Sequence, residues 1–580
     1  MLKKQLVILS IAVLILSLSS CGLFKCKHKE YDVKTVDPNC FAEGYTEHIC
    51  KKCEESYKDN ILPKTHHYFA GAACPNCGMA EITENITPDT EWHSEEVAMF
   101  TLTTKEQLAG FASLVNSGVD FSNKIVYLGE DIDLGYYEWI PIGNAEHAYN
   151  GSFDGDGYTL SGLKINAAAD YVGFFGNSTG KIINLNVVDA NIYSSRDYNY
   201  VSIICGCTTN EITNVSANGF IEAPKSDYVG AIAGGAKPLS VTYSKLTNTA
   251  TVNGKNYVGG IIGDITSTDI VQTDRITNTG DVTGTSQVGG IFGHISANVG
   301  SSVYNATSSA DIIGDYYVGG IIGKSDNVAV STCKNDGSTV TANSYYTEGS
   351  EFRAWLGGFV GYGYSVDNCT NNSDINYNSR GSYVGGIIGY ATHNVKDCTN
   401  NGTITTYTNY VGGIAGTLDS KSSGEIYKNL SNNGNISGKD YVGGVAGQAY
   451  QKINTGGHVT AEIKYISNCA SVRGEGFVGG IIGALVYDNT GRYSTGILST
   501  AASNCIVNLA SLINSGKVSG VSACGELFGS FWSDGASTIT TYTVTGKITI
   551  NDELLEGEYD VGSNTNLTLS GREIYTEATE

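Results

Sequence analysis

The chain has little proline, little charge and few basic residues. Of its 580 residues only 7 are proline, and Asp, Glu, Lys and Arg together make up 16%. A sequence so poor in charge lacks the polar face of long solvent-exposed helices, and its 73 glycines weaken helices further. The glycines do not recur at every third position, which excludes a collagen helix. The composition therefore favours many short strands joined by tight turns.

Basic residues are too few to attract polyanions. The 35 Lys and Arg residues stand against 58 Asp and Glu residues, which gives a formal net charge of −23. A surface of this charge repels nucleic acids and anionic lipid headgroups. We therefore expect no nucleic acid among the partners of this protein.

Long apolar runs are missing after the first twenty residues. At the start, two lysines precede an apolar run over 6–18, in the order of a secretory signal. Residues 18–21, Leu-Ser-Ser-Cys, resemble a bacterial lipobox, which implies cleavage before Cys21 and lipidation of that cysteine. The alternative is an ordinary signal peptide with a chance cysteine. We expect 1–21 to be a lipoprotein signal peptide and the mature chain to be lipid-anchored outside the cell, because no later run approaches the roughly 18 residues that span a bilayer.

Residues 22–80 form a small cysteine-rich module. Cys50 and Cys53 form one C-x-x-C pair, and Cys74 and Cys77 form another after twenty intervening residues. Two such pairs at this separation are typical of a zinc ribbon, in which each turn presents two thiolates to one tetrahedral ion. Further candidate ligands are Cys26, His28 and His66.

Disulfide bonds are the alternative to zinc for stabilising this module. Its six cysteines pair without remainder, and the expected location outside the cytoplasm permits disulfides. The histidines favour zinc, since disulfides need none. The module also resembles short Cys/His repeats at the N-termini of surface proteins of Gram-positive anaerobes. Either staple would be structural, so a structural zinc ion is the one cofactor that we expect.

The string NYVGGIIG at 256–263 recurs in related forms along the chain. We find twelve copies, spaced by 27 to 46 residues. A phosphate-binding glycine loop is used once, between a strand and a helix, so twelve copies indicate a structural repeat. The position of the first Val in each copy is occupied by residues 172, 201, 229, 258, 288, 318, 356, 384, 411, 442, 478 and 524.

A second element, seen as CTNNGTI at 398–404, lies between the glycine-valine units. Each repeat thus predicts about three short strand segments, with VGGIIG as one strand and its bend, and the array predicts a parallel β-solenoid. Cysteines in the second element should stack inward as free thiols. These cysteines are Cys333, Cys369, Cys398, Cys469 and Cys505.

The segments around the repeats suggest a linker and two end caps. Thr103 or Thr104 should begin an amphipathic helix that Gly118 ends, and the helix should cover the first coil. The resulting division is a linker over 81–98, an N-terminal cap over 99–135, the solenoid over 136–530 and a C-terminal β cap over 531–580.

The GG-[IV]-[IAVF]-G repeats, with WIPIG at 139–143 and FDGDGYTLSGL at 153–163, resemble the GLUG-motif family of bacterial surface proteins. The resemblance covers roughly 100–530. It implies an all-β fold, a right-handed parallel β-helix of about 12 or more coils, and an adhesin-like role. The motif also accompanies some large surface peptidases, but this sequence has no HExxH motif, so that activity is not carried over.

We expect a non-catalytic surface protein that binds a host or environmental glycan or protein. The alternatives are a polysaccharide lyase or hydrolase on a β-helix scaffold and a purely structural envelope spacer. Two consecutive coils carry insertions of twenty-one residues, after Gly447 and after Gly483, where ordinary coils have seven or eight. Insertions at the same phase of a solenoid emerge on the same side, although neutral loop drift is an alternative. Candidate binding residues in these insertions are Tyr450, His458, Tyr487, Arg492 and Tyr493.

Overall fold

The computed structural model describes most of the chain between residues 30 and 573. The described residues are 30–38, 44–52, 55–62, 73–74, 79–166, 169–197, 199–337, 339–343, 354–377, 383–420, 426–452, 462–488, 508–514, 517–519, 524–525, 528–533, 543–545, 547–550, 553–556, 559–560, 568–569 and 572–573. They fall into two compact units, 1–81 and 82–580. The smaller unit contains an antiparallel sheet of β1 (Tyr31–Val36), β2 (Gly44–Cys50) and β3 (Ser56–Leu62), with β2 in the centre.

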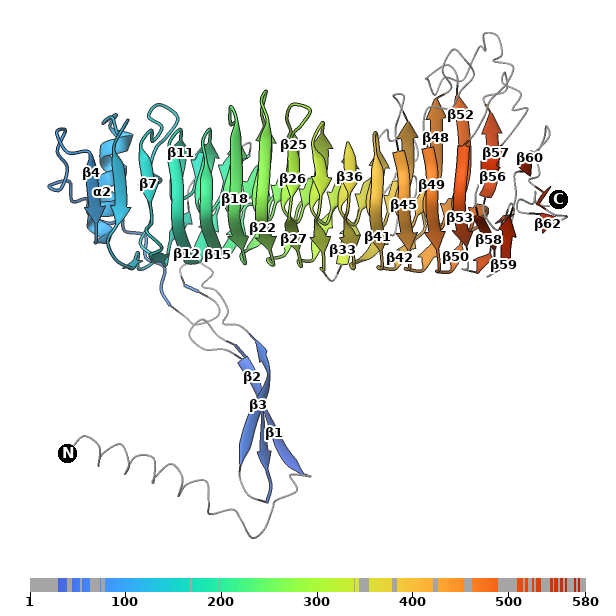
Figure 1. Ribbon diagram of the computed structural model, residues 1–580. Coiled ribbons are helices and arrows are strands. Elements are labelled where there is room, and N and C mark those ends of the chain that lie inside the picture. The colour runs from blue at the N-terminus through green and yellow to red at the C-terminus, as the bar shows by residue number, and fades with distance from the viewer. Residues whose placement is uncertain are drawn as a thin grey trace, which may run out of the picture. The chain divides into compact units, whose positions relative to one another are not determined.

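The larger unit is a parallel β-solenoid, as predicted (Figure 1). One sheet of twelve parallel strands, here called the valine sheet, brings the predicted Val positions into register, as in Val258 beside Val288. Its strands are β10 (Tyr171–Val172), β13 (Tyr200–Val201), β16 (Tyr228–Gly230), β20 (Asn256–Gly259), β24 (Ser286–Gly289), β29 (Tyr316–Gly319), β34 (Trp355–Gly357), β39 (Tyr383–Gly385), β43 (Val411–Gly412), β47 (Asp440–Gly443), β51 (Gly476–Gly479) and β55 (Cys524–Gly525).

A second sheet also has twelve parallel strands, and we call it the isoleucine sheet. Each of its strands begins after a gap of two or three residues from the end of a valine-sheet strand. The prediction that VGGIIG is one strand and its bend is confirmed in part: the chain bends at the central Gly-Ile step between β20 and β21, but the motif contributes to two strands and not to one. The strands are β11 (Phe175–Ser178), β14 (Cys205–Thr208), β17 (Ala233–Ala236), β21 (Ile262–Thr266), β25 (Phe292–Ser296), β30 (Ile322–Asp326), β35 (Val360–Gly363), β40 (Ile388–Ala391), β44 (Ala415–Ser420), β48 (Ala446–Lys452), β52 (Ile482–Asp488) and β56 (Phe528–Ser533).

The third side, here called the asparagine sheet, contains the CTNNG-type elements. Its strands pair in parallel from one coil to the next, and the core inside the three sheets is filled by residues such as Val258, Ile261 and Ile262, which are fully buried. Its main strands are β12 (Lys181–Tyr193), β15 (Ile212–Glu222), β18 (Val241–Asn248), β22 (Val271–Asn278), β27 (Ala306–Ser308), β32 (Lys334–Asn335), β37 (Thr370–Asn371), β41 (Val395–Asn400), β45 (Ile426–Asn432), β49 (Glu462–Asn468) and β53 (Asn508–Asn514).

A ladder of buried asparagines runs along this sheet. Asn371 donates a side-chain hydrogen bond to Asn400 at 2.9 Å, and Asn400 donates to Asn432 at 2.9 Å. Most of these side chains also donate to the backbone carbonyl two residues later, as Asn400 does to Gly402, whereas Asn335 donates to the carbonyl of Gly358 in the next coil. The interior of a solenoid tolerates these polar side chains because their hydrogen-bonding groups are paired. We call this row the asparagine ladder; its members are Asn248, Asn278, Asn335, Asn371, Asn400, Asn432, Asn468 and Asn514.

The second glycine of VGGIIG makes room for this ladder. A Cβ atom on Gly386 would lie 2.4 Å from the Cγ atom of Asn400 and 2.0 Å from the carbonyl oxygen of Gly413 in the next coil. Two coils near the N-terminal end lack both features: Phe174 and Ile203 occupy the glycine position, and Val187 and Ala217 occupy the ladder position. Packing thus explains the second glycine in coils such as that of Gly386, whereas the coil of Asn248 accommodates Ala231 at the equivalent position.

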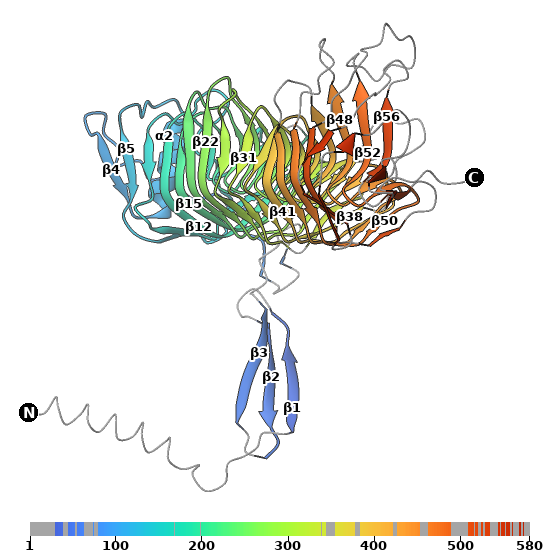
Figure 2. The ribbon, with the colours of Figure 1, turned by 45° about the vertical axis from the view of Figure 1, so that its right-hand side comes forward.

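The single described helix, α2 (Lys105–Asn116), forms where the sequence predicts it, beside β4 (Met99–Leu102) and β5 (Ile125–Leu128) (Figure 2). The Thr104 side chain accepts from the backbone N–H of Gln107, and Gly118 follows the helix with a φ of 92°. The buried face of α2 contains Leu108, Gly110, Phe111, Ala112 and Val115. Its function as an end cap stays a prediction. Among the described residues, no helix is both long and apolar enough to cross a bilayer.

The expected cysteine row is confirmed in part. Cys333, Cys369 and Cys398 are buried and unbridged, and each thiol donates to a backbone carbonyl two residues earlier. Cys469 is exposed, so its predicted inward position is wrong. It follows Asn468 of the ladder instead of preceding the ladder position by two residues. Cys505 lies outside the described residues.

The C-terminal stretch adds to the last described coil. Strands β57 (Thr543–Thr545) and β58 (Lys547–Ile550) pair in parallel with β53. Strands β60 (Tyr559–Asp560) and β59 (Glu553–Glu556) then return antiparallel to β57 and β58. Another identical coil would add to a parallel edge of the sheet. Because β59 and β60 run antiparallel, the sheet has a different kind of edge here.

Candidate functional site

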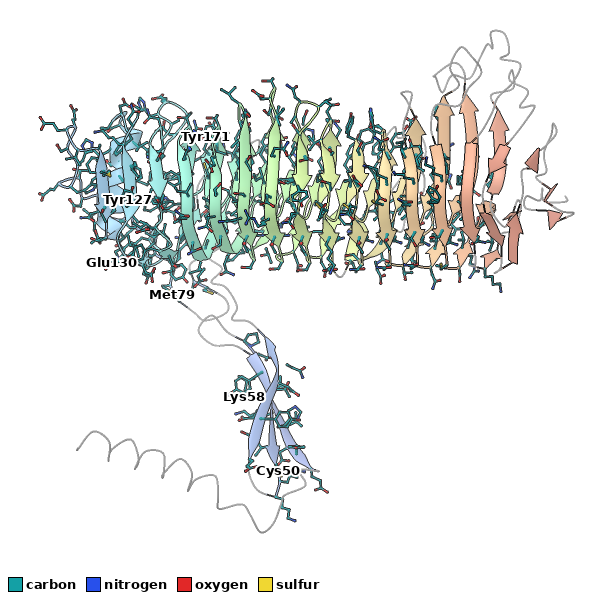
Figure 3. All side chains as sticks on the ribbon, in the orientation of Figure 1. Cys50, Lys58, Met79, Tyr127, Glu130 and Tyr171 are labelled. Atoms are coloured by element: carbon teal, nitrogen blue, oxygen red, sulfur yellow. The ribbon has the colours of Figure 1, made fainter. Side chains whose placement is uncertain are left out.

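A row of stacked aromatic rings lies on the valine sheet, at the position before each Val. Many of these residues have a positive φ, such as Tyr257 at 50° and Tyr410 at 55°. Neighbouring rings are nearly parallel, with centroids 4.5 Å apart for Tyr200 and Tyr228. We call this row the aromatic ladder; its rings are Tyr171, Tyr200, Tyr228, Tyr257, Tyr317, Trp355, Tyr383, Tyr410, Tyr441 and Phe477 (Tyr171 is labelled in Figure 3).

The ladder is interrupted once between Tyr257 and Tyr317, where the position is Gln287. The same coil carries His294 on the adjoining isoleucine sheet. The His294 ring approaches the Tyr257 ring edge-on, with centroids 5.8 Å apart. The one gap in the stacked rings therefore coincides with a titratable side chain.

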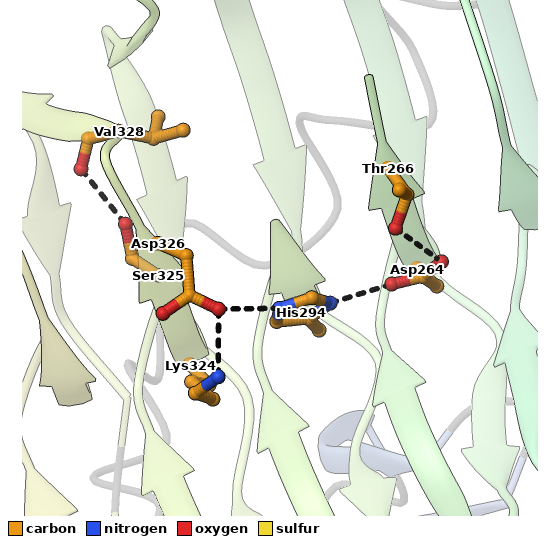
Figure 4. A network of polar contacts seen from close by, with 7 residues as sticks. All are labelled: Asp264, Thr266, His294, Lys324, Ser325, Asp326 and Val328. Carbon is orange, nitrogen blue, oxygen red and sulfur yellow. Dashed lines mark hydrogen bonds and ion pairs between the residues drawn. The ribbon is translucent and has the colours of Figure 1, made fainter. Parts of the chain in front are cut away.

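His294 links three successive coils (Figure 4). Its Nδ1 atom lies 2.6 Å from Asp264 Oδ1 on β21, and its Nε2 atom lies 3.1 Å from Asp326 Oδ2 on β30. Lys324 donates to the same Asp326 oxygen at 2.6 Å. The His294 side chain is 12% exposed, so solvent weakens these interactions little. We call Asp264, His294, Lys324 and Asp326 the polar cluster.

The surroundings shift the ionisation of the polar cluster. Burial lowers the pKa of His294, but hydrogen bonds to Asp264 and Asp326 outweigh burial, so the pKa of His294 lies above its usual value. Burial likewise raises the pKa of Asp326, and hydrogen bonds from His294 and Lys324 reverse this, so that pKa is lowered. The imidazolium form donates to both carboxylates, and neither ring nitrogen remains to exchange a proton with a substrate.

We expect His294 to make the stability of the solenoid fall as the pH rises. A raised folded-state pKa contributes stability that is complete below the unfolded value of about 6.5 and is lost as pH rises through the folded value. His294→Gln should therefore lower the urea midpoint at pH 6, at a cost of about 1.5–3 kcal/mol, and much less at pH 9. Equal losses at both pH values would contradict an ionised His294.

Two tyrosines lie beside the aromatic ladder on the isoleucine sheet. Tyr362 and Tyr390 occupy equivalent positions of adjacent coils, with nearly parallel rings and centroids 5.4 Å apart. The Tyr362 ring is almost perpendicular to those of Tyr317 and Trp355, at 87° and 82°. The Tyr390 ring makes the same contact with Tyr383 at 89°. This position follows Asp264, His294 and Lys324 along the same row of the sheet.

The structure brings together the starting points of the two predicted loops. Tyr450 lies in β48 beside Val486 of β52, and Tyr487 of β52 is paired with Gln451 of β48. The two insertions therefore leave from the ends of neighbouring strands. His458, Arg492 and Tyr493 lie outside the described residues, so their part in a binding site stays a prediction.

Two of the predicted zinc ligands are described. Cys50 and Cys74 are buried, and each begins a turn closed by a bond from its own N–H to the carbonyl five residues later, of Glu55 and of Met79. The zinc ribbon stays a prediction. The positions outside the described residues are Cys21, Cys26, His28, Cys53, His66 and Cys77.

The polar cluster was not predicted from the sequence. Asp264, His294 and Lys324 are each about thirty residues apart, so no local motif joins them. They do occupy the same position after VGGIIG-type units in consecutive repeats. An alignment of the repeats by coil, with a search for charged residues in one column, could have found three of the four.

Comparisons with known proteins agree with the repeat architecture. Residues 380–405 match the family model described as the GLUG motif. Halomucin from Haloquadratum walsbyi is 31% identical over 129 residues, which are 21% of this chain but 1% of Halomucin. A crystal structure of a candidate immunoglobulin A1 protease from Bacteroides ovatus aligns over 73% of this chain and 83% of its own, at 16% identity and a TM-score of 0.23. A TM-score this low carries no argument about fold or function. The chain thus contains a GLUG motif within a parallel β-solenoid.

Proposed function

We propose that the protein is a cell-surface binding rod without catalytic activity, anchored by a lipid on Cys21. The lipobox-like residues 18–21, the GLUG motif and the similarity to Halomucin support a location at the cell surface. The observation that carries the binding role is the pair of partly exposed tyrosines, Tyr362 and Tyr390, beside the aromatic ladder. Tyrosine rings combine a large apolar area with a hydroxyl group and are enriched at binding surfaces. The parallel solenoid holds these rings on rigid strands, which reduces the entropy lost on binding.

The cysteine-rich module completes this proposal as a zinc-stapled unit. It has too few apolar residues for an adequate core, and zinc would add folding energy directly. Cys50, Cys53, Cys74 and Cys77 would hold the ion, with Cys26, His28 and His66 as further candidates. Disulfides among the same cysteines are the alternative.

A binding screen tests this function. The mature protein, residues 22–580 without the lipid anchor, is offered to glycans and extracellular-matrix proteins, and turnover is read on the same samples. We expect saturable binding without cleavage. Removal of 448–463 and 484–502 together reports whether the predicted loops contribute to binding. Binding to nothing on the panel would favour the structural-spacer role and would contradict the proposal.

The polar cluster favours a second candidate function, cleavage of a glycan. Clustered carboxylates with a lysine are the groups that lyases and hydrolases use. However, both His294 nitrogens are bonded to carboxylates, and Lys324 is paired with Asp326. Acid–base catalysis needs a group that is free to reach the substrate, so we rank binding first. Cleavage of any polysaccharide that is lost in His294→Gln would reverse this order.

A further inference from the structure

We propose that Tyr362 and Tyr390 form a flat platform that binds a neutral, hexose-based glycan. This inference rests on the proposed binding function and names the ligand class and the site. It depends on the directions of the rings, on the polar groups at both ends of the pair and on the charge around it. We call Tyr362 and Tyr390 the tyrosine platform.

The ring directions leave the platform, and not the ladder, with a flat aromatic face. Ladder rings such as Tyr317 and Trp355 stack along the solenoid axis at 4.5 Å, so their neighbours cover their faces. Tyr362 is perpendicular to both, and Tyr390 follows it one coil further along the axis. The two platform rings are nearly parallel, at 16° with 5.4 Å between centroids, and are staggered along the axis, and each stands almost perpendicular to the ladder rings beside it. Both residues are partly exposed.

Such a pair of rings suits a sugar. The axial C–H groups of a hexose form an apolar patch that packs on an aromatic face, while its hydroxyl groups lie at the rim of the ring. Adjacent coils repeat at about 4.8 Å. The platform thus offers successive aromatic surfaces along the solenoid axis, as a linear chain of sugar units requires.

Polar side chains lie at both ends of the platform. Lys324 precedes Tyr362 in the row, and its ammonium group is bonded to Asp326. At the other end, the Tyr390 hydroxyl donates to a carboxylate oxygen of Asp419. Carboxylates accept strong, charge-assisted hydrogen bonds from hydroxyl groups. An aromatic surface between two carboxylates therefore matches the apolar centre and hydroxyl rim of a sugar.

The charge around the platform selects a neutral glycan over an acidic one. Asp326 and Asp419 flank it, and the nearby cation Lys324 is already paired. The whole chain carries a net charge of −23. A uronate or sulfated sugar would approach two carboxylates without a free cation to receive it, so it should be rejected.

The experiment compares binding of a neutral hexose oligomer, such as maltohexaose or cellohexaose, with binding of a polyuronate of equal length. The test protein is the mature chain, and calorimetry is read together with Trp355 fluorescence, because that indole lies 6.0 Å from the Tyr362 ring. The double variant Tyr362→Leu, Tyr390→Leu keeps apolar side chains but removes the flat rings. We expect it to weaken binding of the neutral oligomer at least about tenfold. Its Tm should fall, because the variant also loses ring contacts with Trp355 and Tyr383 and the bond to Asp419, so binding is compared at a temperature where circular dichroism shows that both proteins are folded.

Tyr304→Leu is the matched control, since Tyr304 is 45% exposed on the asparagine sheet, and it should bind as the wild type does. Equal affinity of the double variant and the wild type would overturn the platform. Preference for the polyuronate would overturn the ligand class. If the protein binds a protein ligand of the screen but no hexose oligomer, this inference is overturned and the proposed binding function stands. If the wild-type protein binds no ligand in any of these assays, both the platform and the proposed binding function are overturned.

Discussion

Gly386→Ala should unfold the middle of the solenoid or leave it severely destabilised. The added methyl group would lie 2.0 Å from the carbonyl oxygen of Gly413 and 2.4 Å from the Cγ atom of Asn400. The first contact is with backbone of the next coil, so no rotation of a side chain relieves it. Overpacking of this kind costs about 1–3 kcal/mol where the surroundings can shift, and more where they cannot. We expect a cost above about 3 kcal/mol, measured by urea unfolding followed by circular dichroism.

The chain contains its own control for this substitution. Ala231 stands in the equivalent position of an earlier coil, so the fold there already holds a Cβ atom. Ala231→Gly should change the free energy of unfolding by only about 1 kcal/mol or less, through backbone entropy and lost packing. If Gly386→Ala changed the free energy of unfolding as little as Ala231→Gly, the close approach of Gly413 and Asn400 to Gly386 would be contradicted.

Asn400→Ala should be the second most damaging change. It removes the bonds to Gly402 and Asn432 and the bond received from Asn371, all in the fully buried interior. Each buried polar group left without a partner costs about 1–3 kcal/mol. We expect a total loss of about 3–5 kcal/mol, read as a lower urea midpoint of the same transition.

Two variants separate the ladder from a general effect of asparagine. Asn401 is exposed and donates to Asn372 in an outer row, so Asn401→Ala should cost less than about 0.5 kcal/mol. Ser308 replaces asparagine in the ladder, and its buried hydroxyl has no partner within the described residues. Ser308→Asn should restore the missing bond and raise stability by about 1 kcal/mol, since Gly290 leaves the same space as Gly386 does. Destabilisation by Ser308→Asn would contradict a continuous ladder.

Much of the candidate site was out of reach of sequence reasoning. The stacking of the tyrosines that precede each Val, such as Tyr228 on Tyr257, appears only when the coils are superposed. The insertions after Gly447 and Gly483 were expected to share one side, and the paired ends of β48 and β52 agree. The perpendicular placement of Tyr362 against Trp355 depends on a corner between two sheets. No spacing rule within one repeat encodes that corner.

The sequence by itself determined the repeat and its phase. A period of about thirty residues, with Val and Ile at fixed positions, can bury its apolar side chains only by stacking copies, so a parallel solenoid follows from the pattern. The tertiary structure alone decided which side chains of different coils meet. His294 contacts Asp264 and Asp326, thirty and thirty-two residues away, because equivalent positions of adjacent coils lie about 4.8 Å apart. Contacts along the solenoid axis join residues at equivalent positions of successive repeats. Such residues form a site only when the coils are stacked.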